Sequence, residues 1–153
     1  MSNIFKGILF GMIIALGTAF LFMAIGQTAA GGVTSFFGEA WLYVAAVVPF
    51  VLTFAVLGRY FHIQKEVPNK KLWLISFGCA FFVTLYSGTI GAISGEAIVR
   101  DGMDTINVEG TLVWGGIYAV LLLPITTPFA RLIIGLFYKY ITRDRHTNGA
   151  LIK

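Results

Sequence analysis

Four long apolar runs divide this 153-residue chain, and they limit what it can fold into more than any other feature. They cover about residues 7–26, 40–58, 72–93 and 111–141. An α-helix rises ~1.5 Å per residue, so about 20 apolar residues cross the ~30 Å hydrocarbon layer of a membrane. Each run is long enough for one crossing, and the last is long enough to continue beyond it. The sequence therefore predicts an all-α integral membrane protein with four transmembrane helices in a single domain, 1–153.

The composition supports lipid as the solvent of this chain. Hydrophobic residues make up 58% of the sequence and charged residues only 12%, whereas a soluble domain carries about a quarter charged residues. The first run is longer than the ~7–15 apolar residues of a signal peptide, so we interpret it as a true span. The single cysteine, Cys79, excludes an intrachain disulfide and is interpreted as a small buried hydrophobe.

Basic residues gather in alternate loops and at both ends of the chain. Lys6 precedes the first run, the segment 59–71 carries four Lys and Arg residues, and the tail from Lys139 carries four more. The segments 27–39 and 94–110 together hold one basic residue, Arg100. Loops rich in Lys and Arg stay on the cytoplasmic side of a membrane. This pattern predicts that both termini are cytoplasmic, in a cell membrane that we take to be a bacterial inner membrane.

Small residues recur at four-residue spacing in the first and third runs, where they share one helix face. Such stripes let a second helix approach closely, which is a main source of helix association in lipid. They predict a packing surface, either inside the four-helix bundle or against another subunit. The residues of the two stripes are Gly7, Gly11, Ala15 and Ala19, and then Ser87, Gly91 and Gly95.

Two prolines interrupt the last run. Pro124 and Pro128 each remove a backbone donor and press on the preceding turn, so we expect a kink there. The carbonyls near Val120 and Pro124 then need other donors, and Thr126 and Thr127 are close enough to help. The part after Pro128 is expected to continue as a helix into the cytoplasm.

Arg131 is the one charged residue that the apolar runs place at membrane depth. An intramembrane charge is costly and marks a candidate functional residue. Two interpretations remain open: Arg131 snorkels to the inner headgroups or forms a structural pair, or it contacts a lipid phosphate, an anion or a partner. The other basic residues on this side are predicted to contact anionic lipid headgroups or a cytoplasmic protein. They are Arg59, Lys65, Lys70, Lys71, Arg143 and Arg145.

The segment 94–110 is acidic. Its carboxylates lack the ligand spacing of a calcium loop, so we interpret them as a solvated face. Within it, residues 105–109 alternate apolar and polar side chains, a pattern that predicts a short strand.

No pattern in the chain indicates a catalytic or cofactor site. The two histidines, His62 and His146, lie outside the apolar runs and are not grouped with Cys79 as zinc ligands. No carboxylate lies within a span, and no Lys/Arg block is dense enough for nucleic acid. We therefore expect no cofactor, no metal, no nucleic acid and no enzymatic activity.

Two functional hypotheses remain. The first is a non-enzymatic membrane subunit that self-associates and anchors or senses for a larger assembly; components of bacterial stress or phage-defence systems fit this description, although no residue singles out that role. The second is an oligomeric ion channel or small-solute transporter, in which hydroxyls such as Thr84, Ser87 and Thr126 line a polar path. A membrane enzyme, which needs converging titratable groups, is the least favoured class.

Overall fold

The chain folds into helices throughout the part that the structure describes. The computed structural model describes residues 3–30, 40–64, 66–99, 102–104 and 106–150, without the side chains of 26–27, 29–30 and 144–150. Lys65 and the side chain of Arg145 therefore lie outside the described part. The elements in chain order are α1 (Asn3–Ala30), α2 (Ala40–Ile63), α3 (Asn69–Tyr86), the π-helical turn η1 (Ser87–Gly91), α4 (Ala92–Val99), α5 (Val108–Leu121) and α6 (Leu123–Ala150).

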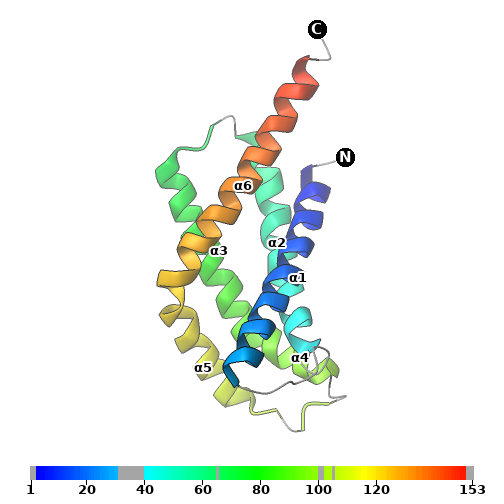
Figure 1. Ribbon diagram of the computed structural model, residues 1–153, viewed down its shortest axis with the longest axis vertical. Coiled ribbons are helices and arrows are strands. Elements are labelled where there is room, and N and C mark those ends of the chain that lie inside the picture. The colour runs from blue at the N-terminus through cyan, green and yellow to red at the C-terminus, as the bar shows by residue number, and fades with distance from the viewer. Residues whose placement is uncertain (1–2, 31–39, 65, 100–101, 105, 151–153) are drawn as a thin grey trace.

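Three to four of these helices are long and apolar enough to cross a membrane. The continuous candidates are Asn3–Ile25, Ala40–Ile63 and Asn69–Val99. The fourth is a bent pair, Val108–Leu121 and Leu123–Arg143, whose axes differ by 68°. Figure 1 shows that α5 begins at the end of the bundle where α4 finishes, and that α6 runs to the opposite end. The all-helical fold predicted from the sequence is confirmed, and the helices support a multi-pass membrane protein.

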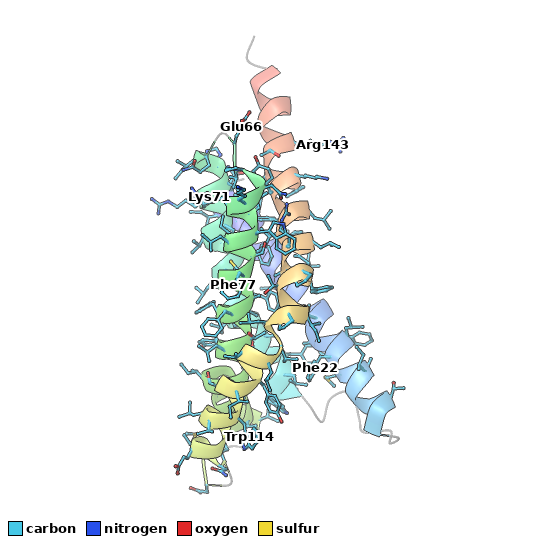
Figure 2. The ribbon with its side chains drawn as sticks, turned by 90° about the vertical axis from the view of Figure 1, so that its left-hand side faces the viewer. Phe22, Glu66, Lys71, Phe77, Trp114 and Arg143 are labelled. Atoms are coloured by element: carbon cyan, nitrogen blue, oxygen red, sulfur yellow. The ribbon has the colours of Figure 1, made fainter. Side chains whose placement is uncertain are left out.

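The outer surface of the bundle is apolar on every side. Phe22 of α1, Val56 of α2, Leu74 of α3 and Ile125 of α6 are 66 to 71% exposed, and Phe77 lies in the middle of the same apolar band (Figure 2). Soluble proteins rarely expose apolar patches of more than a few hundred Å². A continuous apolar exterior is the surface that lipid tails solvate.

The interior is built differently in its two halves. In the half that contains the C-terminal half of α2 and the middle of α6, the ring of Phe137 is fully buried. Its centroid lies 4.8 Å from that of Phe10, 5.1 Å from that of Phe54 and 6.2 Å from that of Phe61. In the other half, small side chains form the contact between α1 and α2. Large rings fill the space where four helices meet, and small residues allow two helices to approach.

The two ends of the bundle carry opposite charge. The start of α1 and the C-terminal half of α6 lie at one end (Figure 1), where Lys71 and Arg143 are also found together with Glu66 (Figure 2). We call this the basic end, and its described Lys and Arg residues are Lys6, Arg59, Lys70, Lys71, Lys139 and Arg143. The described acids at the other end, the acidic end, are Glu96, Asp104 and Glu109.

The predicted strand at 105–109 is wrong where the structure can test it. Val108 and Glu109 form the first turn of α5, and residue 105 lies outside the described part. Asn107 caps this helix, because its side-chain oxygen accepts from the Gly110 amide at 2.9 Å. An Asn cap satisfies an amide that the helix start leaves without a partner, and this local preference outweighs a short apolar–polar alternation.

Candidate functional site

The small-residue stripe of α1 faces α2 of the same chain. A Cβ added at Gly11 would lie 2.7 Å from the Phe50 carbonyl oxygen, and one at Gly7 would overlap another carbonyl of α2. Further along, Ala15 and Ala19 are buried in the same contact. Because backbone rather than side chain stands opposite both glycines, the two helices are as close as their backbones allow.

The second stripe also faces α2. A Cβ added at Gly91 would lie 3.0 Å from the Ala45 carbonyl oxygen, and one at Gly95 would lie 2.6 Å from that of Trp41. The third member of this stripe, Ser87, donates its hydroxyl to the Ala45 carbonyl at 3.2 Å. Both stripes are therefore used inside one chain.

The hydrogen bond from Ser87 replaces a backbone hydrogen bond that Pro49 removes from α2. In a regular helix the amide of residue 49 donates to the carbonyl of residue 45, but proline has no N–H. Pro49 is buried within α2, so water cannot reach the Ala45 carbonyl easily. Ser87 supplies the missing donor from the neighbouring helix. The sequence contains a signal for this site, since Pro49 shows that Ala45 needs a donor, but nothing in it identifies the donor.

The π-helical turn η1 also brings α5 into the bundle. A Cβ added at Gly115 of α5 would overlap the carbonyl oxygen of Gly88 in η1. Next to this contact, Thr89 is buried and donates its hydroxyl to the Leu85 carbonyl. A π-turn inserts one residue into a helix and often marks a functional position. Here it presents Ser87 to α2 and Gly88 to α5.

Arg131 of α6 extends its side chain to the first turn of α3. Its Nη2 donates to the Asn69 side-chain oxygen at 2.6 Å, and its guanidinium carbon lies 5.9 Å from the ring centroid of Trp73. A Cβ at Gly135, one turn further along α6, would lie 2.7 Å from Arg131 Nη1. The Arg131 Nε is buried without a hydrogen-bond partner within the described part of the chain. This geometry matches the interpretation of Arg131 as a structural pair that reaches toward the basic end.

Other cations of the basic end also lie over aromatic rings. Lys71 Nζ lies 5.4 Å from the centroid of Tyr60, and Lys6 Nζ lies 6.0 Å from that of Tyr140. The side chains of Arg59, Lys70 and Arg143 are exposed at the same end. Three cations of this part of the bundle therefore lie beside aromatic rings.

The junction of α5 and α6 interrupts the backbone hydrogen bonds of the fourth candidate span. We call residues 120–125 the elbow. The amides of Ile125 and Thr126 both donate to the Leu122 carbonyl, at 3.0 and 2.8 Å, so the Leu121 carbonyl loses its usual donor, Ile125. Pro124 has no N–H for the Val120 carbonyl. Both carbonyls lose their usual helical donors, and the Val120 carbonyl accepts the Leu122 amide instead.

The threonines that follow do not repair the elbow. The Thr126 hydroxyl donates at 3.0 Å to the Leu122 carbonyl, which already accepts two amides. The Thr127 hydroxyl is buried and has no partner within the described residues. The elbow begins before Pro124, and Pro128 lies inside α6. The expectation that these two hydroxyls satisfy the freed carbonyls is therefore wrong.

Most other hydroxyls within the candidate spans bond to their own helix. Each donates to the carbonyl four residues earlier, a common arrangement in membrane helices. These residues are Thr18, Ser76, Thr84, Thr89 and Ser94. Among the residues that the structure describes, no group of three or more His, Cys, Asp and Glu side chains could hold a metal ion.

The fold and these contacts together support a multi-pass helical membrane protein whose special positions are helix contacts. Comparison with known proteins adds no assignment, because no family model, no curated protein and no solved structure matches the chain.

Proposed function

We propose that this protein is a non-enzymatic subunit of a bacterial inner membrane that self-associates and anchors or senses for a larger cytoplasmic assembly. It crosses the membrane four times, the bent pair α5–α6 forming the fourth span, and both termini lie in the cytoplasm. The separation of charge supports this orientation. The basic end holds all the Lys and Arg residues described outside the apolar runs, and loops rich in these residues stay cytoplasmic.

The observation that carries the proposal is the projection of α6 beyond the other helices at the basic end (Figure 1). This helix is held at its base by contacts with α2 and with the loop that follows it. The Tyr138 hydroxyl accepts from the Val67 amide at 3.3 Å, its ring lies 5.1 Å from that of Phe61, and Ile141 is buried. An anchored helix with a polar extension can pass a change within the bundle to a protein bound outside it.

The rim of the basic end supports a contact with anionic lipid headgroups. Lys6, Lys71 and Arg131 each lie over an aromatic ring, and amphipathic rings prefer the headgroup level of a membrane. Each basic residue near the cytoplasmic surface attracts anionic lipid by about 1 kcal/mol. These contacts hold the base of α6 at a defined depth.

The alternative, an ion channel or small-solute transporter, has less support. A polar path needs hydroxyls that are free to contact an ion or solute. The hydroxyls of Thr84 and Ser76 instead donate to carbonyls of α3 at 2.7 Å, and that of Ser87 donates to α2. Their hydrogen-bonding capacity is used by the bundle itself.

Removal of the projecting part of α6 tests the anchoring function. A variant that ends at Ile141 keeps every buried side chain that the structure describes in α6, so we expect it to insert and remain folded in the membrane. We expect a photo-reactive amino acid at Arg143 in the full chain to cross-link a cytoplasmic protein in intact cells. The matched control carries the same amino acid at Glu109, at the acidic end. Cross-linking to lipid alone at both positions would contradict the proposal.

A further inference from the structure

Arg131 has more hydrogen-bond donors than the described part of the chain satisfies. A guanidinium carries several N–H groups, and one of them, on Nη2, donates to the Asn69 side chain at the surface of the bundle. That partner is neutral, and within the described residues no carboxylate forms an ion pair with Arg131. A charge within an apolar surface is costly unless something neutralises it. The guanidinium therefore still requires a negatively charged acceptor, and one outside the chain can reach it.

The start of α3, which Arg131 contacts, is itself positive. Its first turn holds Lys70 and Lys71 and no acid, and no side chain caps its amides. The start of a helix carries about half a positive charge, which favours an anion at this position. The acidic side chain that the structure describes nearest to this turn in the sequence is Glu66, which is exposed in the loop beyond the start of α3 (Figure 2). A guanidinium and the positive end of a helix repel each other unless an anion lies between them.

The surface next to this contact suits a lipid rather than a soluble anion. Residues three apart share a helix face, so Lys70 lies beside Trp73, the ring that the Arg131 guanidinium also approaches. Trp73 is 45% exposed, and Phe77, one turn further along α3, is 48% exposed. Figure 2 shows that Phe77 lies between Lys71 and the acidic end, within the apolar band. A headgroup held by the two cations therefore has exposed rings directly beneath it for its acyl chains.

We infer that one anionic phospholipid binds at this position, with its phosphate between the Arg131 guanidinium and Lys70. Its acyl chains lie along Trp73 and Phe77. The inference deepens the proposed function and rests on its orientation, in which the basic end lies at the headgroup level. Guanidinium and phosphate form paired, charge-assisted hydrogen bonds, so the phosphate supplies the negative acceptor that Asn69 does not. Because the lipid contacts both α3 and α6, it strengthens the helix contact at the base of the projecting part of α6.

Lipid binding to the full chain tests this inference. Native mass spectrometry of the protein in detergent measures the dissociation constant of the first phosphatidylglycerol that binds. Phosphatidylcholine with the same acyl chains is the neutral comparison, and we expect it to bind about ten-fold more weakly or worse, the effect of losing a hydrogen bond to a charged group. Arg131→Gln keeps an N–H donor for Asn69 but has no charge, and we expect it to abolish this preference.

Lys70→Gln keeps the test decisive if Arg131→Gln does not fold. Lys70 is exposed, and its substitution is expected to weaken phosphatidylglycerol binding about five-fold, the effect of removing one basic residue near a membrane surface. The matched control is Lys139→Gln. It removes the same charge from an exposed position of α6 at the same end, and we expect it to leave the dissociation constant unchanged.

Three results would overturn the inference. Equal affinity for the two lipids would show that no anionic headgroup is recognised. Equal losses in Lys70→Gln and Lys139→Gln would show a general attraction by the basic end instead of one site. Displacement of phosphatidylglycerol by an equal concentration of glycerol phosphate would show that the site takes a soluble phosphate. None of these results affects the expected protein cross-link from Arg143, whereas the reverse orientation in the membrane would overturn both the inference and the proposed function.

Discussion

The Ser87 hydroxyl donates at 3.2 Å to the carbonyl of Ala45, the one carbonyl of α2 that Pro49 deprives of its helical donor. The two residues are far apart in the sequence, and their contact joins the π-helical turn η1 to α2. Pro49 would weaken an isolated helix. Here the carbonyl that it leaves without a donor forms a specific contact with the neighbouring helix.

Ser87→Ala removes this contact and is expected to destabilise the protein by about 1 kcal/mol. The estimate combines the ~0.6 kcal/mol of an average interhelical hydrogen bond in a membrane with the cost of a buried carbonyl without a donor. Reversible unfolding in mixed micelles, followed by circular dichroism, measures the change.

Thr84→Ala is the matched control for Ser87→Ala. It removes a hydroxyl that donates only within its own helix, to Ala80, so we expect a change within about 0.5 kcal/mol. Equal losses for the two variants would show that the contact between Ser87 and Ala45 contributes nothing specific.

The close contact of α1 with α2 predicts opposite results for two glycines of one helix. Gly11→Ala forces a Cβ to 2.7 Å from a backbone carbonyl that cannot rotate away, so a loss of about 1–3 kcal/mol is expected. Gly17 has no atom within 4 Å of an added Cβ, so Gly17→Ala is expected to be neutral or slightly stabilising. The same unfolding measurement compares them, and a Gly11→Ala variant as stable as the parent contradicts the observed packing.

Arg131 is expected to stabilise the contact between α6 and α3. Arg131→Met keeps the length of the stem but removes the hydrogen bond to Asn69 and the contact with Trp73, for a loss of about 1–3 kcal/mol. Arg59→Met, at an exposed position of α2, is the control and should change stability by less than about 0.5 kcal/mol. If Arg131→Met instead leaves stability unchanged and reduces the number of anionic lipids retained in native mass spectra, Arg131 serves lipid binding and not the helix contact.

Sidedness follows from the charges at the two ends. In a Cys79→Ala background, we expect an impermeant maleimide to label Glu109→Cys in intact spheroplasts and to label Arg143→Cys only after lysis. The control is labelling of both variants in detergent. The opposite order would reverse the orientation, and labelling of both in intact cells would mean that the bent pair α5–α6 does not cross the membrane.

The elements of this fold could be predicted from the sequence better than their contacts. Apolar runs about 20 residues long predict helices because lipid leaves the backbone few other ways to satisfy its hydrogen bonds. The glycine spacing in α1 predicted a packing face, but the same spacing suits a neighbour in the same chain or in another, so its position against α2 needed the structure. The bond between Ser87 and Ala45 could not be predicted, because it depends on the rotation of η1 about its axis.

In the last apolar run, too, the sequence predicts the lost hydrogen bonds but not the contacts that result. Pro124 and Pro128 predicted lost donors, which is a covalent property of proline. The position of the break, ahead of Pro124, depends on the Leu122 carbonyl accepting the Ile125 and Thr126 amides, and a sequence does not show which of several acceptors an amide will use. Arg131 was predicted as a candidate for pairing, but its partner Asn69 is 62 residues away in the sequence.

The copy number of the full chain in the membrane tests the proposed function most directly. The protein is extracted with its surrounding lipid into nanodiscs, without passage through detergent, and weighed by native mass spectrometry. We expect particles that contain two or more copies of the 16.7 kDa chain. Particles that contain a single copy at every protein concentration, with no other protein bound, would contradict it.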